Sequence, residues 1–317
     1  MMMPPAADRQ SEPRSPVAWC DGRIVPAASC LLPVGDAGFV LGATVTEQLR
    51  TFRGAPFLPG PHATRLEASL AALSIEPRWP TAEIFTAVAD VAARNHACLA
   101  ADDDLGIVVF ATPGDLPAQH GGRGGPARTV VHSFPLAFSL WADAYDGGVS
   151  LRTVATRQVP DACWPLSAKV RSRLHYYLAD REAAAAEPHA KAVLEHLDGR
   201  VSETSTANVA IVRRGAILTP PPTDALPGVS LGHVRLLAES FGLAWEARSL
   251  TAADRVAADE ILRTSTPSCL LPATRLNGRP VGDGRPGATF RRLLDAWSRT
   301  VGIDIAAQAR RHASACS

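Results

Sequence analysis

The chain has 317 residues, of which 46% are hydrophobic and 20% charged, a composition typical of globular proteins and long enough for two domains. The formal net charge of +1 gives no long-range field that would favour nucleic acid, an anionic membrane or a polyacidic partner. The six cysteines form no Cys-x-x-Cys pair and no Cys/His cluster, so we expect reduced thiols, no metal site and small-molecule partners.

The N-terminal segment is polar and rich in proline, without the apolar stretch of a signal peptide. Residues 1–16 are therefore predicted to be a disordered leader. No later run reaches the roughly 18 apolar residues that a membrane span requires. These features predict a cytoplasmic protein without a membrane segment.

A smaller N-terminal α/β domain is predicted over residues 17–142. It should begin with two strands joined at Asp21-Gly22, followed by an extended or mixed stretch, two helices, a buried strand and a further strand. The corresponding ranges are 19–27, 43–52, a helix opening at Pro61, 81–97, 105–111 and 128–134. In the first helix, Leu66, Leu70 and Leu73 form the apolar stripe, and Arg65 and Ser69 are expected off it.

Glycine and proline mark residues 113–126 as a loop and, with a turn-rich stretch, residues 143–148 as an interdomain linker. A larger C-terminal domain is predicted over 149–304, followed by a tail over 305–317. Within this domain we expect a strand at 149–159, a helix at about 171–186, two hairpins in an antiparallel meander, and a helix after Ser230. The first hairpin has the type I′ signature Asp198-Gly199, and the second turns at Arg214-Gly215.

Several ordered motifs bear on chemistry, and in chain order they read GDAGFVLGATVTEQLRT, HATRLEASL, SAKVRSRL, LDGRVSETSTANV, LPGVS, AADEILRTST and RPGAT. Over roughly residues 20 to 300 they resemble the class IV (fold type IV) pyridoxal-phosphate enzymes. This group includes branched-chain aminotransferases, D-amino acid aminotransferases and aminodeoxychorismate lyases. The resemblance implies a two-domain α/β fold of type IV, pyridoxal 5′-phosphate as cofactor, and a homodimer with its active sites near the interface.

Lysine occurs only at Lys169 and Lys191, and a pyridoxal-phosphate enzyme needs one amine to hold the aldehyde and shuttle a proton. The resemblance gives this catalytic role to Lys169, which opens a K-x-x-[N/S]-R-L pattern, whereas Lys191 begins a predicted hairpin strand. By the same resemblance Glu203 pairs with the pyridine nitrogen and keeps it protonated. Without the motif, Glu203 would read as a surface carboxylate after a hairpin.

The phosphate-binding residues are also implied by the resemblance. Arg65 would use its fork of donors on the phosphate, the alternative being an exposed helix arginine. Val229 and Ser230 would present backbone N–H groups at a helix N-terminus. Ser265 and Thr266 would form a second phosphate loop, although by themselves they also fit an ordinary turn.

The substrate-facing positions depart from the relatives. D-Amino acid aminotransferases carry a tyrosine before the family glutamate, where this chain has Thr46 before Glu47, and Pro113 stands where they have a carboxylate-binding arginine. Arg123, in the adjacent glycine-rich loop, is a candidate for the missing contact, and the alternative is a mobile surface loop. Thr46 and Arg123 are therefore the expected substrate-binding residues, and the identity of the substrate is left open.

The predicted function is amino-group transfer between an amino acid and a 2-oxo acid through a Schiff base on Lys169. The alternative is a lyase of the aminodeoxychorismate type, in which the same lysine drives elimination of pyruvate. Formation of a second pair of keto acid and amino acid would indicate transfer, and release of pyruvate without an acceptor would indicate the lyase. A cofactor-binding protein without catalysis is a third possibility, against which Lys169, Glu203 and Arg65 together argue.

Overall fold

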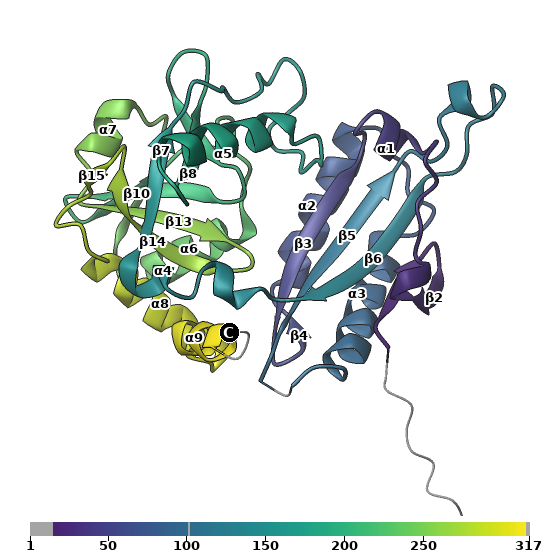
Figure 1. The fold of residues 1–317 in the computed structure, drawn as a ribbon, viewed down its shortest axis with the longest axis horizontal. Coiled ribbons are helices and arrows are strands. Elements are labelled where there is room, and N and C mark those ends of the chain that lie inside the picture. Colours follow the sequence, from purple (N-terminus) through teal and green to yellow (C-terminus); the bar gives the residue numbers. More distant parts are fainter. Residues whose placement is uncertain (1–14, 101, 315–317) are drawn as a thin grey trace, which may run out of the picture.

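The computed structural model describes residues 15–100 and 102–314, and its two β-sheets divide the chain into two halves (Figure 1). The mixed α/β class predicted from the sequence is confirmed. The first sheet takes its strands from residues 17–135 and the second from residues 149–280. Of the predicted leader, residues 1–14 lie outside the described part of the chain.

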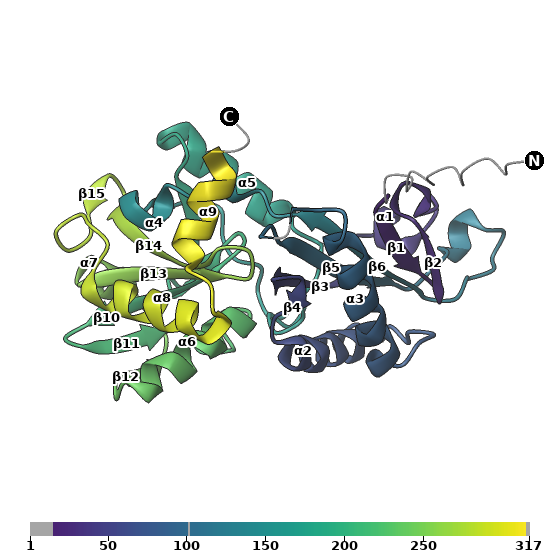
Figure 2. The ribbon, with the colours of Figure 1, turned by 90° about the horizontal axis from the view of Figure 1, so that it is seen from below.

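The first sheet is antiparallel throughout, with the order β2-β1-β6-β5-β3-β4. Two helices, α2 and α3, cover one face of this sheet through a shared apolar core, and the described helices leave the opposite face uncovered (Figures 1 and 2). The elements of this half are β1 (Val17–Cys20), β2 (Arg23–Pro26), η1 (Ala27–Ser29), α1 (Ala37–Val40), β3 (Val45–Phe52), β4 (Ala55–Pro56), α2 (Pro59–Ala72), α3 (Thr81–His96), β5 (Leu105–Thr112), η2 (Pro117–Gln119), β6 (Arg128–Pro135) and η3 (Phe138–Leu140).

Helix α2 buries more of its surface than its apolar stripe predicts. Leu66 and Leu70 pack into the core as expected, and Leu73 caps the helix at its C-terminus. Arg65 and Ser69, expected off the stripe, are buried as well. Hydrophobic periodicity detects only apolar burial, so it missed a second, polar face of α2 that turns toward the other half of the chain.

The second sheet is mixed, with the order β12-β11-β10-β13-β14-β7-β8-β9 and β15 paired with β14. The elements of this half are α4 (Ala144–Gly147), β7 (Val149–Thr153), α5 (Leu174–Ala186), β8 (Lys191–Glu195), β9 (Val201–Thr204), β10 (Asn208–Arg213), β11 (Ala216–Thr219), α6 (Val229–Ser240), β12 (Ala244–Ala247), α7 (Ala252–Val256), β13 (Glu260–Ser265), β14 (Cys269–Leu276), β15 (Arg279–Pro280), α8 (Ala288–Val301) and α9 (Ile305–Ser314).

The predicted antiparallel meander is wrong for this sheet as a whole. The pairs β8/β9 and β10/β11 are antiparallel as expected, but β7 runs parallel to both β14 and β8. Strands β9 and β10 form no ladder of backbone pairs beyond the isolated bridge Thr204–Ala207, and β10 pairs instead with β13. Because β9 and β10 are buried on both faces, their apolar pattern carries no information on which strands lie beside them.

The turn at Asp198-Gly199 is not the predicted type I′ turn. That turn needs positive φ at both central residues, and here only Gly199 has it, at 86°. The Gly199 N–H donates to the His196 carbonyl and the His196 N–H to the Arg200 carbonyl, so Leu197 joins the loop as an extra residue. Positive φ at both residues of a pair occurs instead at Asp21-Gly22 and Arg214-Gly215.

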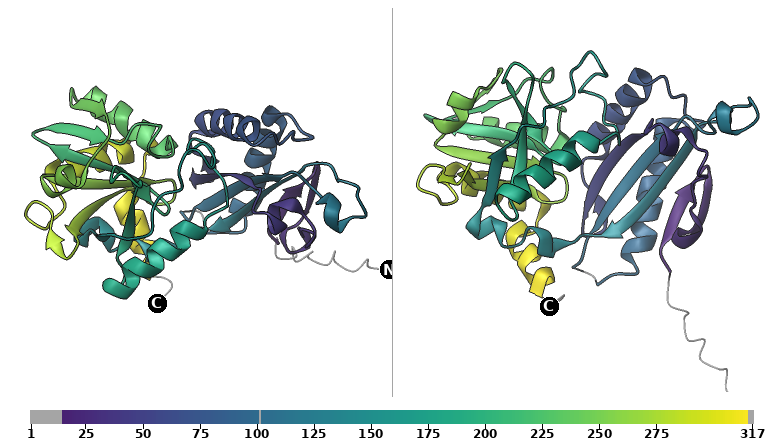
Figure 3. Two further views of the ribbon diagram at one scale, coloured as in Figure 1. Left: turned by 90° about the horizontal axis from the view of Figure 1, so that it is seen from above. Right: turned by 45° about the horizontal axis from the view of Figure 1, so that its top comes forward.

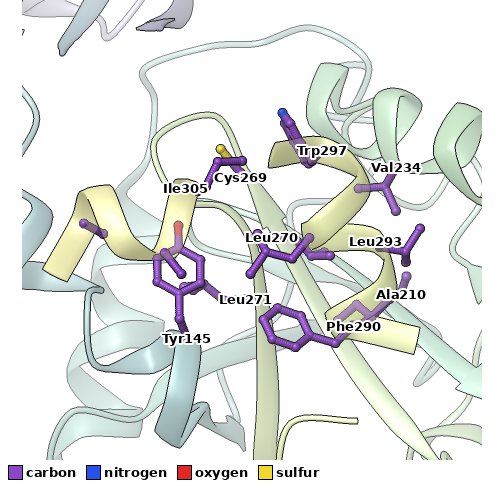
Figure 4. Packing of buried hydrophobic residues seen from close by; sticks show 14 of the residues in the cluster. Tyr145, Ala210, Val234, Cys269, Leu270, Leu271, Phe290, Leu293, Trp297 and Ile305 are labelled. Atoms are coloured by element: carbon purple, nitrogen blue, oxygen red, sulfur yellow. The ribbon is translucent and has the colours of Figure 1, made fainter. Parts of the chain in front are cut away.

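The predicted linker and tail both belong to the core of the second half. Within 143–148 the chain forms α4, whose Tyr145 is buried and donates a hydrogen bond to the Ser268 carbonyl at 2.8 Å. Within 305–317 it forms α9, whose apolar residues pack beside α8 and β14, as Figure 4 shows for Ile305. Ile305, Ala306 and Ala309 are spaced so that they lie on one side of the helix, which explains this burial. The stripe was hard to predict because two of its three residues are alanines. Residues 315–317 lie outside the described chain.

None of the described helices has the length and apolar character to cross a membrane. Across residues 15–100 and 102–314 there is no group of three potential metal-ligating side chains. The five cysteines in those ranges are free thiols, and Cys316 lies beyond them.

Candidate active site

An open cavity lies where the two halves meet. Helix α2 contributes Arg65, and the segment before α5 contributes Lys169. The walls are completed by the end of β9, the start of α6 and the end of β13. The N-terminal end of α5 stands beside the first half, so residues far apart in the sequence meet here (Figures 1 and 3).

Lys169 is held by backbone contacts with both elements of the first half. Its carbonyl accepts a hydrogen bond from the Thr46 N–H of β3 at 2.9 Å, and its own N–H donates to Ser69 Oγ of α2 at 3.0 Å. Burial and the charges of the neighbouring arginines together lower the pKa of the Lys169 amine to about 8, although the charge of Glu47 acts in the other direction. With this lowered pKa, a larger fraction of the Lys169 amine is neutral, and therefore nucleophilic, than in an exposed lysine.

Glu47 provides a fixed negative charge near Lys169. Its carboxylate is fully buried and bound on both oxygens, by Arg65 Nε at 2.7 Å and Arg65 Nη2 at 2.8 Å, with His62 Nδ1 at 2.6 Å. Burial alone would raise the pKa of Glu47, but the charge and hydrogen bonds of Arg65 and His62 bring it down to about 2. Glu47 is therefore an anion across the physiological range.

Arg65, predicted to bind phosphate, uses most of its donors inside the protein. Its fork is bidentate on Glu47, and its Nη1 donates to the Pro227 carbonyl just before α6 at 2.9 Å. Only 8% of Arg65 is exposed, which excludes the alternative of a solvated helix arginine. Because Arg65 also lines the cavity, it joins Glu47 of the first half to the loop that begins α6.

Glu203 lies at the end of β9 on the cavity wall. Its Oε1 accepts a hydrogen bond from Tyr176 Oη at 2.6 Å, and its Oε2 accepts one from Asn208 Nδ2 at 3.2 Å. Burial raises the pKa of Glu203 to about 7, although the Tyr176 hydroxyl and the Arg173 charge act in the other direction. Sequence reasoning missed Tyr176, seven residues after Lys169, because its partner comes from another element.

Polar groups without partners gather where a phosphate was predicted. Helix α6 begins at Val229 and Ser230 without a capping side chain, so its first backbone N–H groups remain available at the cavity. Ser265 and Thr266 line the same cavity. The buried Thr264 Oγ1 beside them has no hydrogen-bond partner in the described chain.

These features fit pyridoxal phosphate on grounds internal to the structure. An uncapped helix N-terminus and an unpartnered hydroxyl suit a phosphate, a buried amine of lowered pKa suits an aldehyde, and a buried carboxyl suits a ring nitrogen. Lys169, Glu203, Val229, Ser230, Ser265 and Thr266 are brought together around one cavity, as is Arg65.

The two predicted substrate residues lie in different parts of the first half. Thr46 contacts the Lys169 segment through its N–H, and its hydroxyl donates to the Val109 carbonyl at 3.0 Å. Arg123 lies in the loop after β5, which projects from the end of the first half away from the second half (Figure 1). Within one chain, therefore, Arg123 is not brought to Lys169. Sequence reasoning also passed over Arg171, which lies next to Thr46.

Comparison with known proteins agrees with this geometry. The family model described as amino-transferase class IV matches residues 44–276, and the chain therefore belongs to the class IV aminotransferase family. A D-alanine aminotransferase of Bacillus licheniformis is 26% identical over 283 residues, which cover 89% of this chain and 95% of that protein. A branched-chain-amino-acid aminotransferase-like protein of Arabidopsis thaliana is 28% identical over 94% of this chain, which spans about half (52%) of its length.

Solved structures share the fold over nearly the whole chain. The branched-chain aminotransferase of the thermophilic archaeon Thermoproteus uzoniensis with norvaline has a TM-score of 0.80 at 25% identity, covering 91% of this chain and 95% of that one. A branched-chain amino acid aminotransferase of T.th. with pyridoxamine 5′-phosphate has a TM-score of 0.81 at 25% identity, covering 92% and 96%. The fold is thus type IV, and the protein is an aminotransferase whose cofactor is pyridoxal phosphate.

Proposed function

We propose that this protein transfers the amino group of an amino acid to a 2-oxo acid, with Lys169 as the amine that holds the cofactor and moves the substrate proton. The observation that carries the proposal is the half-buried Lys169, with its pKa lowered to about 8, in a cavity that Glu203 and the start of α6 also line. When bound, pyridoxal phosphate supplies an aldehyde that takes up amines and an aromatic ring that spreads negative charge from the substrate Cα.

The residues of the chain divide the remaining work. As a neutral amine, Lys169 takes the Cα proton and returns it to a neighbouring carbon. Glu203, with a pKa of about 7, shares a proton with the ring nitrogen and so keeps the ring able to accept electrons. Val229 and Ser230 at the start of α6, with Ser265, Thr266 and the free donors of Arg65, hold the phosphate.

The aminodeoxychorismate type of elimination would use the same lysine and carboxyl. The relatives named above are aminotransferases, which favours transfer. The test offers the holoenzyme D- and L-amino acids with 2-oxo acid acceptors and measures both products. A stoichiometric new pair of amino acid and keto acid is expected, whereas pyruvate release without an acceptor would replace transfer by elimination.

The Lys169 assignment is tested independently of turnover. Borohydride reduction of the holoenzyme should attach the cofactor to the peptide that contains Lys169. The variant Lys191→Arg removes the second lysine of the chain but keeps its positive charge, and it should be labelled to the same extent. Label on the Lys191 peptide, or no label on cofactor-loaded protein, would remove Lys169 from its role.

We also propose a homodimer located in the cytoplasm. Large apolar side chains at Phe39, Leu41 and Leu174 are exposed in the single chain, by 73%, 63% and 69%, and such residues are typical of an interface. Free thiols throughout the described chain suit a reducing compartment. Sedimentation equilibrium should give twice the mass of one chain, and cell fractionation should place the protein with cytosolic markers.

A further inference from the structure

Arg171 lies two residues after Lys169. Its side chain is held by neighbouring groups, none of which is a carboxylate that would neutralise its charge. Its Nε donates to Thr46 Oγ1 at 3.4 Å, and its guanidinium carbon lies 5.3 Å from the centre of the Phe110 ring. Its side chain is exposed in the single chain. These contacts orient the planar fork while leaving both terminal nitrogens free of partners within the described residues.

The charge of Arg171 has no acidic partner among the described residues. Across residues 15–100 and 102–314, no carboxylate lies within ion-pair distance of Arg171, whereas Arg65 is bidentate on Glu47. Arg173, two residues further on, is also without an acidic partner but donates to the Ser205 carbonyl. An oriented guanidinium with free terminal nitrogens is complementary to a carboxylate, which accepts two parallel hydrogen bonds.

The backbone brings Arg171 close to the reacting amine. The Arg171 N–H donates to the Thr44 carbonyl and the Thr46 N–H to the Lys169 carbonyl, both at 2.9 Å, and Val170 between them bridges to Val45. Lys169, Val170, Ser172 and Arg173 of this segment line the cavity, and Arg171 stands between them with its side chain exposed. The Arg171 charge is indeed one of those that lower the pKa of Lys169.

The surroundings of Arg171 belong to the face of the first sheet that points away from α2 and α3. Val45 and Val109 pack against α2 and α3, while Thr46 and Phe110 alternate with them and point to the other face. Thr46 is the position where relatives carry a substrate-facing tyrosine, and Pro113 occupies the place of their carboxylate-binding arginine. Arg171 thus supplies a guanidinium to a face where the chain has lost one.

We propose that Arg171 binds a carboxylate of the amino-acid substrate and so takes over the part that Pro113 cannot play. This rests on the proposed function, because the ligand is taken to be the amino acid whose amine reaches Lys169. The α-carboxylate and the side-chain carboxylate of a dicarboxylic amino acid offer the same chemistry, and different substrates distinguish them.

The first test measures binding without turnover. The holoenzyme is titrated calorimetrically with 4-methylvaleric acid, which has a carboxylate and no amine, and with the uncharged 4-methylvaleramide. Arg171→Gln should weaken binding of the acid about ten- to a hundredfold, as expected for one charge-assisted contact, and leave the amide within about twofold. Arg171→Lys should fall between, because lysine keeps the charge and loses the fork.

The matched control is Arg181→Gln, which removes another exposed arginine without a carboxylate partner, one that contacts only Tyr177 within the described chain. It should bind the acid as the wild type does. Equal weakening of acid and amide in Arg171→Gln, unchanged binding of the acid, or no binding of the acid by the wild type would each overturn the proposal.

A second test assigns the carboxylate through kcat/KM. A tenfold or greater fall in Arg171→Gln for both alanine and glutamate would assign Arg171 to the α-carboxylate, and a fall for glutamate alone to the side chain. A wild type that transaminates no amino acid would refute the proposed function, while the calorimetric result would still decide whether Arg171 binds a carboxylate. Equal kcat/KM values of variant and wild type on both substrates would contradict the proposal.

Discussion

At the scale of single residues, the raised pKa of Glu203 predicts how the free energy of unfolding depends on pH. Its pKa is raised from 4.5 to about 7, so the folded chain holds this proton more tightly than the unfolded chain. The resulting stabilisation is complete below pH 4.5 and is lost as the pH rises to about 7, a change of up to roughly 3 kcal/mol. Glu203→Gln should flatten this decline.

The measurement is urea unfolding between pH 4.5 and 8. It uses the cofactor-free protein, because a bound cationic ring would change the pKa of the Glu203 carboxyl. Glu76→Gln removes an exposed carboxyl and should keep the wild-type slope. The same slope in Glu203→Gln as in the wild type would show that Glu203 is not the titrating group.

A second prediction concerns Arg65, whose removal leaves the buried Glu47 carboxylate without its cationic partner. Arg65→Ala leaves Glu47 with His62 alone, and breaking a buried pair in this way costs about 3 to 5 kcal/mol. Unfolding of the cofactor-free variant in urea should show this loss, and Glu47→Gln in the same chain should recover part of it. Arg94→Ala breaks only an exposed pair with Asp90 and should cost at most about 1 kcal/mol. A comparable loss in both variants would contradict the buried role.

Single residues of the site were predicted from motifs, but their partners were not. Lys169 and Glu203 stand in local patterns that a sequence displays directly. The hydrogen bond from Tyr176 to Glu203 joins α5 to β9, and no local periodicity encodes a contact between elements. Arg171 was passed over for the same reason, since its significance comes from its contacts with Thr46 and Phe110 of the first sheet, which lie far from it in the sequence.

At the scale of elements, helix α9 is an example of a buried helix that the sequence pattern did not predict. Its stretch was predicted as a tail, because one isoleucine among alanines and polar residues makes a weak apolar stripe. The types of α2, α3, β5 and α6 followed from local periodicity, whereas strand neighbours in the second sheet depend on contacts that the pattern of a buried strand does not reveal. Burial of α9 likewise depends on what the rest of the chain offers it.

A third prediction tests whether α9 is part of the core. Ile305 is 1% exposed, so Ile305→Ala should lower the free energy of unfolding by about 2 to 5 kcal/mol through lost burial and the cavity left behind. Arg310→Ala, on the exposed side of the same helix, loses only an ion pair with Asp146 and should cost at most about 1 kcal/mol. Urea unfolding compares the two variants, and equal losses would mean that α9 does not depend on its buried side.

At the scale of the whole molecule, the two halves are connected through buried polar contacts as well as apolar ones. From β3 in the first half, Arg50 donates through Nη1 to the Pro267 carbonyl at 2.9 Å and through Nη2 to Gln308 Oε1 of α9 at 3.2 Å. Gln308 in turn donates to Asp104 Oδ2 in the first half at 2.7 Å. Since Pro267 follows Ser265 and Thr266, this network also supports one wall of the cavity.

The final prediction is that Arg50 makes the halves unfold together. Arg50 is 1% exposed, and Arg50→Met would remove the donor to the part-buried Pro267 carbonyl and leave the buried side-chain oxygen of Gln308 without this donor, the latter at a cost of about 1 to 3 kcal/mol. Calorimetry of the cofactor-free wild type should show one transition, with calorimetric and van't Hoff enthalpies equal, and the variant a lower Tm and a calorimetric enthalpy above the van't Hoff value.

The control for this prediction lies three residues along the chain. Arg53 also reaches the second half, donating to the Gly302 carbonyl at 2.6 Å, but it does so from an exposed position. Water replaces that contact when it is lost, so Arg53→Met should change Tm little and keep a single transition. If Arg50→Met also unfolds in one transition with an unchanged enthalpy ratio, the apolar cluster that Phe52 shares with α8 and α9 suffices to couple the halves.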